Sequence, residues 1–169
     1  VQVKPDLQGK AAFAVGKYQM IPDTLLRATE KIAGCNVEEL FGPVQQEAFG
    51  IYLLTTKRPK LAKYLAGDTE ITVVDAQMEM AREWAGVRIP QAIFRKDYPP
   101  HMALLAGNSY YAGVGSNPGV EDVNMKKAND TKAVLMAAQK KISQDDELQQ
   151  IINLDKKHKE MSKKKEQVK

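Results

Sequence analysis

The sequence predicts an all-α or α-dominated α+β protein, with a helical domain followed by a helical, basic C-terminal tail. Helix-start signals recur at short intervals, each followed by apolar residues at helical spacing. No segment alternates apolar and polar residues over the length of a strand, and residues 71–74 form the only short β-branched run. Hydrophobic residues make up 43% of the 169 residues, yet no apolar run approaches the roughly 20 residues of a membrane-spanning helix.

The helices of the body are predicted from their terminal residues. Asp23 can cap a helix that ends at Gly34, and Pro43 suits the first position of the next helix. Pro59 begins a further helix that closes at Gly67. Two capping boxes start the remaining helical segments: Asn36 with Glu39, and Thr72 with Asp75, the latter helix running to Gly86.

Residues 87–101 contain three prolines and are expected to form an irregular connection, with a short helical piece at 91–95 and weak helical character at 101–105. A glycine-rich loop follows. From about residue 120 the composition changes, so we expect a body of residues 1–122 and a tail of residues 123–169. Tail helices are predicted at 128–140 and 145–156, and the almost wholly polar residues beyond 158 favour disorder.

Charge divides the chain in the same way. Residues 126–169 hold twelve lysines and seven acidic residues, a net charge of +5, whereas residues 1–125 carry −1. The tail is either a solvated, frayed end or a docking element, and its partner would be a protein, an anionic membrane or an anionic wall polymer. Nucleic acid is the less favoured partner because the tail has no aromatic residue on which bases could stack.

The residue inventory excludes several classes of site. Cys35 is the single cysteine, so no intrachain disulfide forms, and His101 and His158 stand too far apart for zinc-ligand spacing. Neither a phosphate-binding loop nor a nucleophile elbow occurs. We therefore expect no metal and no cofactor.

Two segments carry residue types suited to binding a sugar polymer: Gly16–Gln19 and Asn108–Asn117. Tyr18, Tyr110 and Tyr111 offer aromatic faces, and the amides of Gln19 and Asn108 can meet N-acetyl and hydroxyl groups. Glycines let the backbone approach a ligand closely. The alternative is that the tyrosines pack in the core and the glycines are ordinary turn residues.

These segments resemble motifs of lytic transglycosylases and lambda-type phage lysozymes, in the same order along the chain. Residues 16–24, Gly-Lys-Tyr-Gln-Met-Ile-Pro-Asp-Thr, resemble the Gly-x-x-Gln motif, and residues 110–115, Tyr-Tyr-Ala-Gly-Val-Gly, resemble the Tyr-Asn-Ala-Gly-x-Gly type. Residues 41–47 are similar to the Pro-x-x-Gln-Asp helix start of the lambda type, and residues 83–85 also recur in phage relatives. The resemblance covers roughly residues 12–119.

The resemblance implies a lysozyme-like domain over residues 1–122, lacking its N-terminal part, from a phage or prophage endolysin or virion muramidase. Such a glycosidase cleaves the peptidoglycan bond between N-acetylmuramic acid and N-acetylglucosamine by single-glutamate general acid catalysis, without metal or cofactor. Gln19 would line the cleft, and Tyr110 or Tyr111 would lie near the acid. It would act at the bacterial wall or periplasm, reaching it in the virion or from the host cytoplasm, since no signal segment starts the chain.

The catalytic acid is the departure from this pattern. The family's glutamate precedes the Gly-x-x-Gln motif, where residues 1–15 hold only Asp6. We expect the glutamate to be encoded upstream of Val1, with Asp6 as a weaker candidate, and Glu47, Glu79 and Glu83 as solvated helix charges. The alternative function is a non-catalytic peptidoglycan-binding or assembly module with a degenerate cleft and a basic docking tail.

Overall fold

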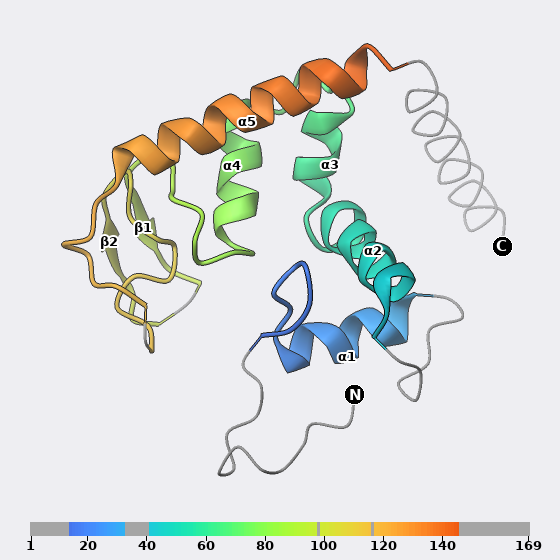
Figure 1. Cartoon of the computed structure of the whole chain (residues 1–169). Coiled ribbons are helices and arrows are strands. Elements are labelled where there is room, and N and C mark those ends of the chain that lie inside the picture. Colours follow the sequence, from blue (N-terminus) through green and yellow to red (C-terminus); the bar gives the residue numbers. More distant parts are fainter. Residues whose placement is uncertain (1–13, 33–40, 98, 116, 146–169) are drawn as a thin grey trace, which may run out of the picture. The chain divides into compact units, whose positions relative to one another are not determined.

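The computed structural model describes residues 14–32, 41–97, 99–115 and 117–145. Within these ranges 49% of the residues are helical and the only sheet is a two-stranded antiparallel ribbon, which makes the described chain α-dominated α+β. The chain divides into two compact units, residues 1–59 and 60–169 (Figure 1). None of the helices in the described ranges is both long and apolar enough to span a membrane.

Unit 1 pairs two helices that both begin with proline. Helix α1 is Pro22–Lys31 and α2 is Pro43–Tyr52, with a π-helical turn η1, Leu53–Lys57, after it. The predicted start at Pro43 is confirmed. Asp23 does not cap α1 as predicted, because extended Ile21 is the N-cap and Asp23 lies in the first turn, where its charge favours the helix dipole. The buried hydrophobic residues of this unit include Met20, Ala28, Phe49 and Leu53.

Unit 2 contains the remaining elements, except that the first residue of α3 is the last residue of unit 1. They are α3 Pro59–Leu65, α4 Val73–Ala81, β1 Ile93–Arg95, β2 Met102–Leu104 and α5 Met125–Ser143. The predicted starts of α3 and α4 are confirmed. Thr72 and Asp75 form a complete capping box, and Gly67 ends the α3 segment with φ +84°. Helix α4 ends at Ala81, short of the predicted Gly86.

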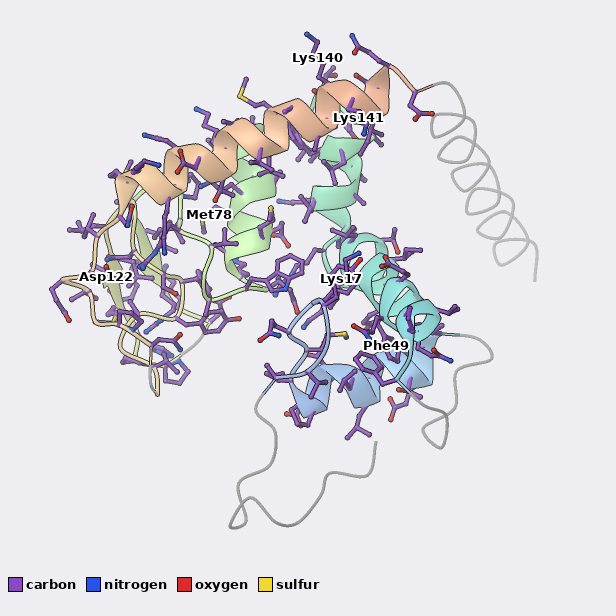
Figure 2. The ribbon with its side chains drawn as sticks, in the orientation of Figure 1. Lys17, Phe49, Met78, Asp122, Lys140 and Lys141 are labelled. Atoms are coloured by element: carbon purple, nitrogen blue, oxygen red, sulfur yellow. The ribbon has the colours of Figure 1, made fainter. Side chains whose placement is uncertain are left out.

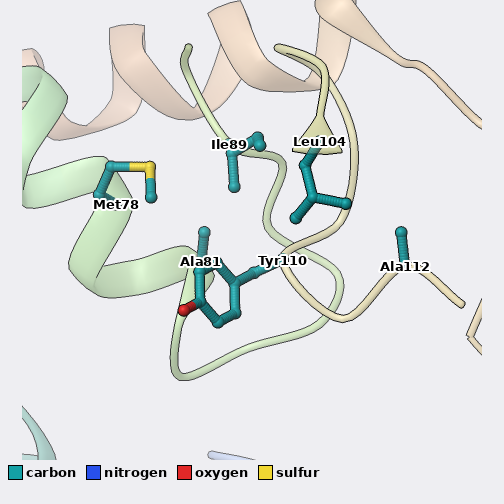
Figure 3. Close-up of a cluster of buried hydrophobic side chains, with 6 residues drawn as sticks. All are labelled: Met78, Ala81, Ile89, Leu104, Tyr110 and Ala112. Carbon is teal, nitrogen blue, oxygen red and sulfur yellow. The ribbon is translucent and has the colours of Figure 1, made fainter. Parts of the chain in front are cut away.

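The ribbon corrects two predictions. Residues 93–95 and 102–104, expected to be helical, pair as antiparallel strands, with Phe94 opposite Ala103. Each strand is only three residues long, too short for an alternating pattern to identify from sequence. The buried side of the ribbon contributes to the core of unit 2, which joins Met78 and Ala81 of α4 to Ile89, Leu104, Tyr110 and Ala112 (Figure 3).

Helix α5 is part of unit 2, although the composition suggested that a tail begins at residue 123. Ala128 and Leu135 are buried, and α5 packs on α4 (Figure 1). The fully buried amide of Gln77 on α4 donates to the carbonyls of Arg88 and Ala128 and so ties the two helices together. The first predicted tail helix, 128–140, lies within α5, whereas most of the second, 145–156, lies outside the described residues.

Candidate functional site

The Gly16–Gln19 segment forms the loop of a tight hairpin, here called the Val15–Met20 hairpin. The amides of Val15 and Met20 each donate to the other's carbonyl at 3.0 Å. Two loop residues adopt positive φ, Gly16 at +70° and Gln19 at +50°. A positive φ is ordinary for glycine but uncommon for glutamine. Gln19 therefore has a backbone conformation that residues other than glycine rarely adopt. Its exposed amide donates to the Gly16 carbonyl at 3.0 Å.

The hairpin lies directly on the segment that begins α2. The Lys17 backbone N–H donates to Gln46 Oε1 at 2.7 Å, and Gln46 Nε2 donates to the Phe41 carbonyl. Two glycines make the approach possible. A Cβ on Gly16 would lie 2.5 Å from the Phe41 ring, and one on Gly50 would lie 2.5 Å from the Tyr18 ring. Residues 16–19 and 41–47, singled out separately in the sequence, are thus in contact.

A charged cluster joins the same two segments. Lys17 Nζ and the Tyr18 hydroxyl each donate to a different oxygen of the Glu47 carboxylate, both at 2.7 Å. The Lys17 ammonium also lies 5.3 Å from the centre of the Tyr18 ring; Lys17 and Phe49 mark the place in Figure 2. The hydrogen bond from Lys17, then that from Tyr18, lowers the pKa of Glu47 below 4.5. Glu47 is therefore ionised at neutral pH and is not a proton donor there.

The second predicted segment lies in unit 2, where both tyrosine hydroxyls are held internally. Tyr110 is buried, with its hydroxyl donating to Asp97, and Tyr111 donates its hydroxyl to the Arg82 carbonyl. The two rings meet edge to face at 5.6 Å, and the Arg82 guanidinium lies 5.6 Å from the centre of the Tyr110 ring. Burial, then the hydrogen bond to Asp97, raises the pKa of the Tyr110 hydroxyl. Tyr110 can therefore orient a carboxylate but offers no open face to a sugar.

Asn108, predicted to bind substrate, is fully buried and holds the loop. Its Oδ1 accepts from the Leu105 amide at 2.7 Å, and its Nδ2 donates to the carbonyls of Val120 and Asp122. In this arrangement the side chain serves three backbone groups and presents nothing to a ligand. Asn108 is a residue of the loop's architecture.

Sequence reasoning missed two residues that the structure places against this loop. Asp97 accepts from Tyr110 across 13 residues. Arg95 is fully buried and donates to the carbonyls of Pro100, Tyr110 and Ala112. No rule of sequence spacing connects Arg95 and Asp97 with the Tyr110 loop. The ribbon beside them was predicted to be helical, so the sequence did not indicate that they meet. The only local signal was that charged Arg95 directly follows apolar Ile93 and Phe94.

The five predicted binding residues are therefore divided between the units: Tyr18 and Gln19 in unit 1, and Asn108, Tyr110 and Tyr111 in unit 2. The weaker acid candidate, Asp6, lies outside the described residues, as does Cys35. In the described ranges, no three His, Cys, Asp or Glu side chains gather in a way that could hold a metal ion.

Comparison with known proteins adds no relative: no family model, curated protein or solved structure matches this chain.

Proposed function

We propose that this chain is the peptidoglycan-recognising part of a lysozyme-like, glycan-strand-cleaving protein of phage or prophage origin. The Val15–Met20 hairpin, fixed on α2, would hold the amino-sugar strand. Cleavage between N-acetylmuramic acid and N-acetylglucosamine would proceed by general acid catalysis, in which a carboxylic acid protonates the leaving oxygen. No cofactor takes part in that chemistry.

The main support is that exposed Gln19 has a positive φ on a hairpin that is held against α2 by the hydrogen bond from the Lys17 backbone to Gln46. Residues kept in sparsely populated backbone conformations concentrate at ligand-binding sites, and each costs about 1–3 kcal/mol. One N–H of the Gln19 amide is bonded to the Gly16 carbonyl, and the second N–H and the Oε1 acceptor match the carbonyl and N–H of an N-acetyl group. Tyr18 beside it is partly exposed and adds an aromatic edge.

The charged cluster supports a positioning role for its members. Glu47 is bonded to both Lys17 and Tyr18, so these three side chains fix the loop relative to α2 before any ligand arrives. A loop already ordered in the free protein loses less conformational entropy on binding, which favours affinity. The same ionised Glu47 would stabilise positive charge that develops on a sugar bound beside it.

The ionised state of Glu47 also favours a second candidate function, a non-catalytic peptidoglycan-binding module. The carboxylate of this cluster cannot donate a proton at neutral pH, because its pKa is lowered. If no other acid serves the bound strand, the hairpin binds glycan without cleaving it. Cleavage of peptidoglycan distinguishes the enzyme from the non-catalytic module, whereas both candidates are expected to bind peptidoglycan.

The test uses the whole chain with purified, dye-labelled peptidoglycan. Co-sedimentation measures binding, and release of soluble dye measures cleavage. Gln19→Gly removes the amide but suits the positive φ, so we expect about tenfold weaker binding with no loss of folding stability. The matched control is Gln91→Gly, which removes an exposed glutamine from unit 2.

Unchanged binding by Gln19→Gly, with the control equally unchanged, would refute the role of the hairpin. Dye release by the unaltered chain would favour the enzyme, and binding without release would favour the module. Mass analysis of any released fragments distinguishes hydrolysis from formation of a 1,6-anhydro ring, because only hydrolysis adds water.

A further inference from the structure

Helix α5 carries a positive charge that the preceding part of unit 2 does not share. Its 19 residues hold five lysines and one acidic residue, a net charge of +4. Residues 60–124 hold six lysine or arginine residues and eight acidic residues, a net charge of −2. A separation of charge within one folded unit creates an electrostatic field that attracts anions to its basic element. The five lysines are all exposed, and together they are called the lysine face: Lys126, Lys127, Lys132, Lys140 and Lys141.

The lysine face covers every side of α5 except the one that packs in unit 2. At about 100° per residue, the five side chains spread over roughly 220° of the helix circumference, from Lys132 round to Lys127. The remaining arc contains Ala128 and Leu135, the two buried residues of the helix. The apolar side of α5 is therefore already used in packing, and its charged side faces solvent.

The positions of the lysines do not follow from the stability of the helix. Lys140 and Lys141, labelled in Figure 2, lie in the last turn, where the helix dipole favours positive charge. Lys126 and Lys127 lie in the first turn, where the dipole disfavours it. Lys126 is paired with Asp130 at 2.8 Å, whereas the other four lysines form no ion pair with the described residues. Their charge is available to a partner.

We propose that the lysine face binds a flexible, linear polyanion of the bacterial cell wall, in which phosphodiester groups link polyol units. The inference rests on the proposed function for the location of this partner, but it uses none of the residues of the Val15–Met20 hairpin. A flexible chain can follow the lysines round the helix and contact several of them in turn. Each contact releases counterions from the polymer, which favours binding at low salt.

The geometry favours such a polymer over a membrane or a nucleic acid. A flat bilayer touches one side of a helix, and an interfacial helix inserts an apolar face, which in α5 is already packed in unit 2. Duplex DNA is stiff, with a persistence length of about 50 nm, so it also meets one side. Single-stranded nucleic acid is held by stacking on aromatic rings, and α5 contains none.

The experiment measures binding of the full chain to a synthetic poly(glycerol phosphate) by calorimetry. Combining Lys132→Gln, Lys140→Gln and Lys141→Gln should weaken binding about 30-fold, at about threefold for each exposed ion pair lost. Lys132→Arg, Lys140→Arg and Lys141→Arg together should retain the affinity, because the interaction requires only the charge. The unfolding midpoint of each variant, followed by Trp84 fluorescence, checks that unit 2 remains folded.

The matched control removes the same amount of charge from other exposed positions of unit 2. It combines Lys60→Gln, Lys63→Gln and Lys96→Gln and should leave the affinity unchanged. Raising the salt concentration from about 50 to about 200 mM should weaken binding of the parent chain at least about tenfold, and should affect the triple glutamine variant of α5 less.

Two single variants test whether the partner follows the curvature of the helix. Lys127 and Lys132 lie at opposite edges of the lysine face, so a flexible polymer should lose about threefold in affinity with Lys127→Gln and again with Lys132→Gln. A loss with one variant and none with the other would overturn the inference, because a flat or stiff partner reaches only one edge.

The remaining outcomes separate this inference from its alternatives. Equal losses in the α5 triple and in the control triple would overturn it, since net charge alone would then explain binding. Tighter binding of the parent chain to duplex DNA, or to phosphatidylglycerol vesicles, than to poly(glycerol phosphate) would also overturn it. A loss confined to the α5 glutamine triple, with the arginine triple and the control unchanged, supports the lysine face.

The proposed function is tested apart from the lysine face with peptidoglycan from which the anionic polymers have been removed. Gln19→Gly should weaken binding to this material, and the α5 glutamine triple should not. If the parent chain binds poly(glycerol phosphate) but not the stripped peptidoglycan, the proposed function fails while the lysine face still binds the polyanion. If it binds the stripped peptidoglycan but not poly(glycerol phosphate), the lysine face is wrong and the hairpin site stands.

Discussion

Arg95 gives the sharpest prediction about stability. Its guanidinium is buried among backbone carbonyls: Nη1 reaches the Tyr110 oxygen at 2.6 Å and the Ala112 oxygen at 3.2 Å, and Nη2 reaches the Pro100 oxygen at 2.7 Å. Arg95→Met keeps an apolar stem of similar length but removes every one of these donors. Three carbonyls would then be left without the partners that the native side chain supplies.

The expected cost follows from these contacts. An orphaned buried acceptor costs about 1–3 kcal/mol, so the carbonyls of buried Tyr110 and Ala112 would together cost roughly 2–6 kcal/mol, whereas water can reach the carbonyl of exposed Pro100. Removing a buried charge returns several kcal/mol of desolvation energy, which offsets part of this sum. We expect Arg95→Met to lower the free energy of unfolding of unit 2 by about 3 kcal/mol. Arg95→Lys should fall between, because an ammonium lacks the planar fork that reaches several carbonyls at once.

Urea unfolding followed by tryptophan fluorescence measures this cost in the correct part of the chain. Trp84 is the single tryptophan and lies in unit 2, so its emission reports on that unit. With a slope of about 2 kcal/mol/M, the midpoint for Arg95→Met should fall by about 1.5 M. Lys96→Met removes a positive charge from the next, exposed position and should stay within about 0.5 kcal/mol of the parent. An Arg95→Met midpoint equal to that of this control would refute the reasoning.

Three further predictions concern the contact between the Val15–Met20 hairpin and α2, and the Asn108 loop. Gly50→Ala would place a Cβ 2.5 Å from the Tyr18 ring, so the hairpin should move off α2; hydrogen exchange at the Met20 amide should accelerate about tenfold, whereas Gly86→Ala, with nothing within 4 Å, should not change it. The side-chain carbon shifts of Glu47 should titrate below 4.5, and Lys17→Met should bring the midpoint back toward 4.5. Because the pKa of Glu47 is lowered in the folded state, the stabilisation from the Lys17–Glu47 pair is present above pH 4.5 and is lost as the pH falls through the folded pKa. Glu47→Gln should abolish this pH dependence. A stability difference between the parent and Glu47→Gln that does not change with pH would contradict the prediction. Asn108→Ala should lower the Trp84-monitored unfolding free energy by roughly 3 kcal/mol, and Asn129→Ala on exposed α5 should not; equal stabilities would argue that Asn108 is not architectural.

The sequence predicted best where a structural signal is local. Thr72 and Asp75 satisfy each other's backbone within one turn. Pro43 and Pro59 each begin a helix because the first N–H groups of a helix have no acceptor within the helix, so the N–H that proline lacks costs no helical hydrogen bond. It predicted poorly at residues 91–105. The strands there are held by their partner strand and by Arg95, and neither influence can be found within a short window of sequence.

The candidate site shows the same division. The resemblance directed attention to Tyr18, Gln19, Asn108, Tyr110 and Tyr111, and the structure gives them different surroundings. Gln19 is exposed on a braced hairpin, whereas Asn108 and Tyr110 are buried and bonded internally. Burial depends on contacts from distant parts of the chain, so a motif alone cannot separate a ligand contact from a residue that holds the loop.

By itself the sequence determined the helix-rich class and the starts of α2, α3 and α4. It also singled out Gly16–Gln19 as a candidate binding segment. These follow from backbone hydrogen bonding and side-chain types within a few residues. Only the tertiary structure decided that Glu47 is held ionised by Lys17 and Tyr18, that Asp97 is the carboxylate joined to Tyr110, and that α5 packs on α4. Each of these depends on groups 13 or more residues apart, and such groups meet only when apolar burial brings their elements together.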